Sequence, residues 1–142
     1  MSTIHPYHKF ILSLLLLLWT PLVWAKTWNV CGDCEHSSLK ETIALAQPYD
    51  TLLVQKGTYR EYEILVDKPL VIKGINYPIV DWEQKGEIFR VTSDHVTLDG
   101  LFVINVGVSY TKDNAAIRVV QSKDFTIRNM VLEQLFFGIY LE

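Results

Sequence analysis

The chain has no excess of basic residues, and this absence narrows the range of its partners. It contains 13 Lys and Arg against 16 Asp and Glu, a formal net charge of −3. No stretch gathers basic residues with interleaved aromatic ones, as a nucleic-acid-binding face would require. Hydrophobic residues make up 49% and charged residues 20%, which is typical of a globular protein rather than a disordered or collagen-like one. We therefore expect no nucleic-acid partner.

Motifs of common catalytic sites are also missing. The sequence has no Ser-His-Asp arrangement, no Gly-rich phosphate loop and no zinc-hydrolase motif. Several aspartates fall at predicted turns, where Asp side chains cap backbone groups. They are Asp67, Asp81, Asp94, Asp99, Asp113 and Asp124. We expect these residues to stabilise turns, and we expect the protein to have no catalytic activity of its own.

Long apolar runs are confined to the first 25 residues. A polar start that carries only Lys9 leads into the uncharged 16-residue run Phe10–Ala25, which contains Leu14–Leu18. Val23-Trp24-Ala25 places small or β-branched residues at the −3 and −1 positions, which completes the pattern of a secretory signal peptide. The run is shorter than the roughly 20 residues that cross a bilayer core, so an uncleaved membrane anchor is the weaker alternative. We predict a signal peptide over 1–25 and an exported, periplasmic chain over 26–142, whose formal charge becomes −4 once Lys9 is removed.

Cysteine is scarce, and the two cysteines are close together. Cys31, Cys34 and His36 form the pattern Cys-x-x-Cys-x-His. An exported protein with two cysteines at this spacing favours a local disulfide. Two thiolates with the imidazole of His36 would instead suit Cu(I), which prefers soft sulfur ligands. A redox-active pair is a third hypothesis, and the sequence leaves all three open.

One helical pattern occurs after the predicted leader. Ser37 or Ser38 can cap it, and Glu41 lies three residues after Ser38, as in a capping box. Apolar residues then recur at helical spacing over Leu39–Ala46, and Pro48 ends the pattern. A helix of about nine residues is unstable alone, so it must pack its apolar stripe against another element.

After Pro48 the apolar period changes from 3.6 to about 2. Short runs share the order Ile-x-Val, a polar pair, then apolar-Thr/Val-apolar-x-Gly/Asn. Leu70, Val96 and Phe125 are matched positions, 26 and 29 residues apart. The first run is Leu52–Val54, and Lys56-Gly57-Thr58-Tyr59 ends it. Repeats of this length built from short strands are the signature of a β-solenoid, in which stacking buries the apolar face of each turn.

A β-sandwich is the alternative fold, since it also has short strands. It would lack internal self-similarity and would use tight two-residue hairpin turns, of which Asp99-Gly100 is the one instance. Gly74, Gly100 and Asn129 fall at predicted bends, where left-handed conformations are tolerated. We predict an all-β, right-handed parallel β-helix with a short helix covering the open edge of its first turn. Because the sequence stops inside the apolar pattern Tyr140-Leu141-Glu142, we expect an N-terminal part of a longer protein.

The order of the motifs resembles one family. The motifs are Gln47–Val54, Lys56–Glu61, Asp67–Gly74, Pro78–Asp81, Val96–Leu101 and Phe137–Leu141. Over roughly residues 28–142 this string resembles NosD, a periplasmic β-helix family. The Gly-Thr-Tyr and Lys-Pro-Leu elements also recur in pectin-lyase-like solenoids, so they support the fold more than the function. Tyr49 is a departure, because the family usually has Gly there in a Pro-Gly-Asp turn.

The resemblance implies a maturation factor for nitrous oxide reductase, an enzyme of denitrification. NosD-like proteins support assembly of the reductase's copper–sulfur cluster. Their expected partners are an ABC transporter, through which they associate with the membrane, a copper chaperone and the reductase itself. The alternative is a secreted carbohydrate-binding or polysaccharide-cleaving β-helix. Such a protein would gather acids and an Arg or Lys on one outer face over successive turns. A purely structural or adhesive solenoid is a third hypothesis.

Overall fold

The computed structural model describes residues 24–109 and 111–142. Most of the predicted signal peptide, residues 1–23, lies outside this range. Trp24 and Ala25, the last two residues of the predicted leader, are described and exposed. Among the described residues, no helix is long and apolar enough to cross a membrane.

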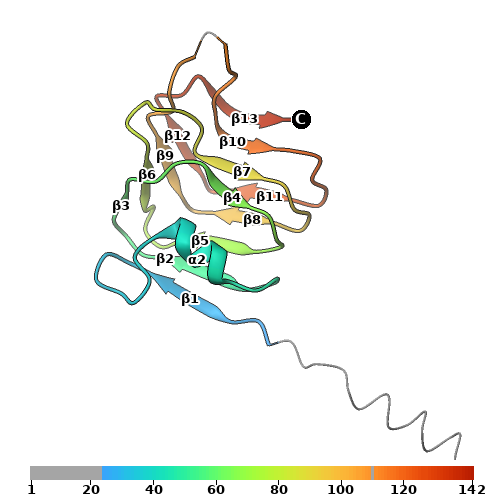
Figure 1. Ribbon diagram of the computed structural model, residues 1–142. Coiled ribbons are helices and arrows are strands. Elements are labelled where there is room, and N and C mark those ends of the chain that lie inside the picture. The colour runs from blue at the N-terminus through green and yellow to red at the C-terminus, as the bar shows by residue number, and fades with distance from the viewer. Residues whose placement is uncertain (1–23, 110) are drawn as a thin grey trace, which may run out of the picture.

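The chain winds into a right-handed parallel β-helix with three sheets, whose successive turns stack from β1 to β13 (Figure 1). Sheet A contains β1 (Thr27–Val30), β2 (Thr51–Val54), β5 (Val71–Gly74), β8 (Thr97–Asp99) and β11 (Thr126–Arg128). Sheet B contains β3 (Thr58–Tyr59), β6 (Ile79–Asp81), β9 (Phe102–Ile104) and β12 (Val131–Glu133). Sheet C contains β4 (Ile64–Val66), β7 (Phe89–Val91), β10 (Ala115–Val119) and β13 (Phe137–Leu141). Every named strand pair is parallel, which confirms the predicted fold class.

The strand register confirms the repeat and adds one strand. β5, β8 and β11 align so that Leu70, Val96 and Phe125, each preceding its strand, stack on one another. The segment 56–59 was expected only to end the first strand, but its second half forms a strand of its own, because Thr58–Tyr59 is β3 and pairs with β6. The Tyr59 ring is buried, and its hydroxyl donates to the carbonyl oxygen of Gln55 at 2.9 Å. This strand is too short to produce a visible period.

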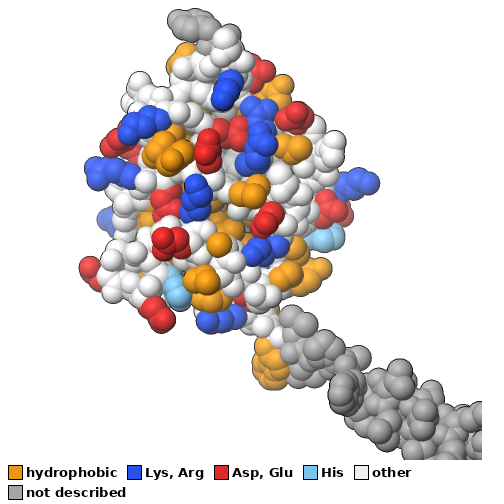
Figure 2. All heavy atoms as spheres, in the orientation of Figure 1, with side chains coloured by type: hydrophobic (Ala, Val, Ile, Leu, Met, Phe, Trp, Pro, Cys, Tyr) orange, Lys and Arg blue, Asp and Glu red, His pale blue; other side chains and the backbone are white. Residues whose placement is uncertain are grey.

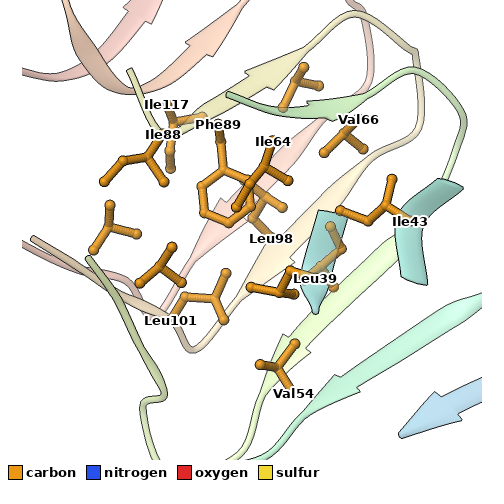
Figure 3. Packing of buried hydrophobic residues seen from close by; sticks show 14 of the residues in the cluster. Leu39, Ile43, Val54, Ile64, Val66, Ile88, Phe89, Leu98, Leu101 and Ile117 are labelled. Carbon is orange, nitrogen blue, oxygen red and sulfur yellow. The ribbon is translucent and has the colours of Figure 1, made fainter. Parts of the chain in front are cut away.

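The core is a column of aliphatic side chains with two aromatic rings, those of Tyr59 and Phe89, and Figure 3 shows part of this packing. In sheet C, Ile64, Phe89 and Ile117 are aligned on successive strands, and all three are fully buried. Each inward residue is therefore covered by its counterpart in the next turn. This stacking removes apolar area from water that a single turn would leave exposed.

Helix α2 (Leu39–Leu45) covers the first turn, as predicted. It packs against β4, β1 and β2, and its Leu39 and Ile43 enter the core (Figure 3). Ser38 is the N-cap, since its Oγ accepts from the backbone N–H of Glu41 at 3.2 Å. The helix occupies the place that a strand of sheet C takes in later turns, so it protects the edge of β4.

The carboxylate at the N-terminus of α2 comes from another turn. Glu61 Oε1 accepts from the backbone N–H of Leu39, and its Oε2 accepts from that of Lys40, both at 2.8 Å. The Ser38 hydroxyl also donates to Glu61 at 3.0 Å. The prediction of Ser38 as the capping hydroxyl is therefore confirmed. The carboxylate at the helix terminus comes from Glu61 and not from Glu41.

A lysine from the same turn satisfies the other end of α2. Lys68 Nζ donates to the carbonyl oxygens of Ile43 and Ala46 at 3.0 Å and of Ala44 at 3.2 Å. Negative charge at the N-terminus and positive charge at the C-terminus both oppose the helix dipole. Glu61 and Lys68 flank β4, so the strand and its helix are joined at both ends.

The predicted bends have two different physical causes. Gly100 and Asn129 have φ of 72° and 51°, as expected for left-handed positions. Gly74 has an ordinary φ, so the predicted reason is wrong there. A Cβ on Gly74 would clash with the carbonyl oxygen of Gly100 and lie 2.7 Å from Pro78 Cδ. Gly74 is thus required by the close stacking of two turns.

Candidate functional site

The cysteine loop lies beside the first strand of sheet A. Cys31 and Cys34 form a disulfide with a Cα–Cα distance of 5.0 Å. The His36 ring packs edge-on against Trp28, with ring centroids 4.9 Å apart. The backbone N–H of Cys31 also donates to the carbonyl oxygen of His36 at 3.1 Å, which closes the loop.

The disulfide bears on the hypothesis of a copper site at Cys31, Cys34 and His36. Copper binding needs thiolates, and in the disulfide neither sulfur is one. The residues in this oxidation state therefore do not fit a Cu(I) site. Within 24–109 and 111–142, no three His, Cys, Asp or Glu side chains are grouped so that they could hold a metal ion. Copper binding by the reduced pair stays a prediction.

A groove of about 990 Å³ runs along the outer face of sheet C. Its floor carries outward residues of successive strands, and its wall comes from the loops that precede β7 and β10. The lining includes Leu65, Glu87, Arg90, Arg118, Tyr140 and Glu142. Leu65, Arg90, Arg118 and Tyr140 are aligned in the sheet register, so they form one ladder across the turns.

A charged cluster occupies the centre of this groove. Arg118 Nε donates to Glu87 Oε2 at 2.5 Å, and Arg118 Nη1 lies 3.3 Å from Glu142 Oε2. Glu87 Oε1 accepts in turn from Arg90 Nε at 3.2 Å. The Arg118 and Glu87 side chains are only 12% and 14% exposed. The hydrogen bond to Glu87 is the main reason that the pKa of Arg118 lies above its ordinary value, so this guanidinium is a fixed cation and not a proton acceptor.

An aromatic ring adjoins the cluster. The Arg118 guanidinium lies 4.6 Å from the centroid of the Tyr140 ring, and Arg118 Nη2 also donates to the carbonyl oxygen of Asp113. Guanidinium, carboxylate and phenol groups on one face can donate to and accept from the hydroxyls of a polar ligand. Positive and negative side chains are interspersed over the visible face in Figure 2, without a field of one sign.

The sequence interpretation missed this cluster, although a signal for it existed. Glu87, Arg90 and Arg118 flank or alternate with the inward residues of sheet C, so they were predictable as outward-facing. What the sequence did not provide was the length of the intervening loops, which decides whether outward groups of different turns meet. The 31 residues that separate Glu87 from Arg118 correspond to one turn with its loop.

Aspartates at turns bind groups of neighbouring turns. Asp81 Oδ1 accepts from the side-chain amide of Asn105 at 2.9 Å. Asp94 Oδ1 accepts from the backbone N–H of Lys123 at 2.6 Å. These contacts agree with the interpretation of such aspartates as turn-stabilising groups.

No protein-family model, curated protein or solved structure matches this chain.

Proposed function

We propose that this chain is part of an exported NosD-like accessory protein, which supports assembly of the copper–sulfur cluster of nitrous oxide reductase. It would act as a scaffold beside an ABC transporter and a copper chaperone, without catalysis of its own. Support comes from the ordered motif string, whose elements occupy successive turns of one parallel β-helix.

The observation that carries this proposal is the backbone at Tyr49. The resemblance requires a Pro-Gly-Asp turn before β2, and this chain has Pro48-Tyr49-Asp50 there. Tyr49 has φ of 72°, in the left-handed region that favours glycine. The departure from the family pattern therefore keeps the backbone conformation that the pattern would require.

Deletion of the full gene in its source organism tests the proposal. We expect the reductase to be produced at normal level but without its catalytic copper cluster, so that nitrous oxide reduction is lost. Complementation with the wild-type gene should restore both activity and copper content. A reductase that keeps its copper in the deletion strain, or an organism without the enzyme, would rule the proposal out.

Carbohydrate binding is the second candidate function, and the groove on sheet C favours it. Glu87, Arg90, Arg118 and Glu142 come from successive turns and converge on one outer face. This is the arrangement that a carbohydrate-directed β-helix needs, and Tyr140 adds a ring that can stack on a sugar. Arg118 is held by two carboxylates, which suits ligand positioning better than proton abstraction.

Binding measurements on the full protein would test this second function. We expect Arg90→Ala and Tyr140→Ala each to weaken binding to a responsive polysaccharide at least tenfold in a glycan array followed by calorimetry. Lys73→Ala, which removes an exposed cation on sheet A, is the matched control and should leave binding unchanged. Absence of binding to neutral, acidic and amino polysaccharides alike would exclude this function.

A further inference from the structure

Asp50 is a buried carboxylate at the start of the first complete turn. Its residue is 1% exposed, and three N–H groups point at it. Trp28 Nε1 and the backbone N–H of Gln47 donate to Oδ2, both at 2.8 Å. The backbone nitrogen of Lys26 donates to Oδ1 at 2.7 Å. Neither proposed function gives this carboxylate a role.

The partner of Asp50 Oδ1 is the atom that leader removal would change. The predicted cleavage breaks the bond between Ala25 and Lys26, and Lys26 then begins the chain. Its nitrogen changes from an amide N–H into a primary amine, which is protonated at pH 7 because the ordinary pKa of an α-amino group is about 7.7–8.0. Trp24 is 79% exposed and Ala25 is exposed too, so the two described residues before the bond are open to solvent.

We propose that Asp50 is the binding site for the new amino terminus, and that cleavage after Ala25 turns the Lys26–Asp50 hydrogen bond into an ion pair. The pair forms where the amide nitrogen already lies, so the backbone need not move. The hydrogen bond already has an ionised acceptor, and cleavage gives it an ionised donor, so the attraction between opposite charges is added to the bond. Processing of the leader thus stabilises the first turn of the solenoid.

Other contacts of Lys26 hold the terminus in place. The backbone N–H of Thr51 donates to the Lys26 carbonyl oxygen at 2.9 Å, and Lys26 Nζ lies 3.5 Å from the centroid of the Trp28 ring. Burial raises the pKa of Asp50, but hydrogen bonds from Trp28, Lys26 and Gln47 outweigh it and leave that pKa below the ordinary value. The carboxylate is therefore ionised when the amine is protonated.

The location explains why such a pair is useful. β1 ends sheet A, and β2 is the one named strand that it pairs with. On its other edge, Val30 alone forms a bridge, to His36. A terminal strand frays unless its end is fixed, and an unprotected sheet edge invites pairing with other chains. The ion pair would fix β1 only in the processed protein.

The first test uses the whole exported protein and needs no variant. Intact mass and N-terminal sequencing should show Lys26 as the first residue. Titration of the α-amine by isotope-edited NMR should give a pKa at least one unit above the ordinary range, because a carboxylate at this distance favours the charged form. A different first residue, or an amine that titrates in the ordinary range, overturns the proposal.

The second test asks whether the stabilisation of β1 by the free amino terminus depends on Asp50. The full chain beginning at Lys26 is compared with one that carries Gly-Ser before Lys26, which keeps an amide at that nitrogen. We expect the extension to speed hydrogen exchange of the β1 amides about tenfold, the factor that matches one pKa unit. Asp50→Asn should abolish the difference, while Asp33→Asn, an exposed acid in the adjacent loop, should preserve it. Equal exchange in the two chains would overturn the proposal even if Asp50→Asn fails to fold.

Discussion

Tyr49 occupies a backbone conformation that its own Cβ disfavours. Its φ is 72°, and the residue is 62% exposed, so little packing offsets the strain. A left-handed backbone conformation costs a residue with a Cβ about 1–2 kcal/mol of stability. Glycine avoids this cost but loses more conformational entropy on folding, so a substitution to glycine recovers only part of it. We expect Tyr49→Gly to raise the free energy of unfolding by roughly 0.5–1 kcal/mol in urea titrations. Tyr49→Ala keeps the Cβ and is the control; an equal gain from it would refute the backbone explanation.

Asp99 gives a second prediction at the residue scale, on acid stability. A hydrogen bond from the Asn129 side chain to Oδ1, 2.8 Å long, is the main reason that the pKa of Asp99 lies below its ordinary value, and Arg128 Nη2 lies 3.0 Å from Oδ2. The unfolded chain therefore binds a proton at a higher pH than the folded one. The stability from ionised Asp99 is complete above its unfolded pKa of about 3.9 and is lost as pH falls through the lower folded value.

Unfolding measured from pH 6 to pH 2 checks this sign. Asp99→Asn should be less stable than wild type at pH 6, and the two curves should converge as the pH falls. The Lys123→Ala variant, which keeps Asp99 and its partners, should lose stability in parallel with wild type. A gap between wild type and Asp99→Asn that widens in acid would contradict the assignment.

At the scale of elements, α2 is stabilised at its two ends by two residues of the following turn, in addition to the packing of its apolar side chains. It spans Leu39–Leu45 and is too short to persist alone. Glu61 and Lys68 bind its N- and C-terminal backbone groups. We expect Glu61→Ala to cost about 1–2 kcal/mol, as loss of an N-cap does. Lys68→Met should cost about 0.3–1 kcal/mol.

Hydrogen exchange of the α2 amides distinguishes a local loss of helix capping from a loss of stability in the whole molecule. Both variants should speed exchange in α2 while leaving β8 and β9 at wild-type rates. Asp67→Ala removes an exposed acid next to Lys68 and should leave α2 protected. Uniform acceleration over the whole chain would show that the two residues act on global stability instead.

At the scale of the molecule, the strands that repeat along the sequence could be predicted, whereas the side-chain contacts between different turns could not. Sheets A and C were visible because their strands repeat apolar residues at matched positions, such as Leu70, Val96 and Phe125. β3 was missed because its two residues carry no period. The Glu61 cap and the Glu87–Arg118 pair were missed because both join residues more than 20 positions apart. Such contacts depend on loop lengths, which the repeat does not specify.

Gly74 tests the stacking itself. A Cβ there would meet the carbonyl of Gly100 in the next turn and Pro78 Cδ at 2.7 Å. Backbone of a stacked turn cannot yield without shifting its ladder, so we expect Gly74→Ala to cost about 2–3 kcal/mol, the upper range for overpacking. Gly57→Ala is the matched control, because its Cβ would lie 3.6 Å from the Tyr59 ring, an ordinary contact. Thermal unfolding of both variants would decide: a small, equal effect would mean that adjacent turns separate easily, whereas a loss confined to Gly74→Ala would show that their spacing is fixed by backbone contact.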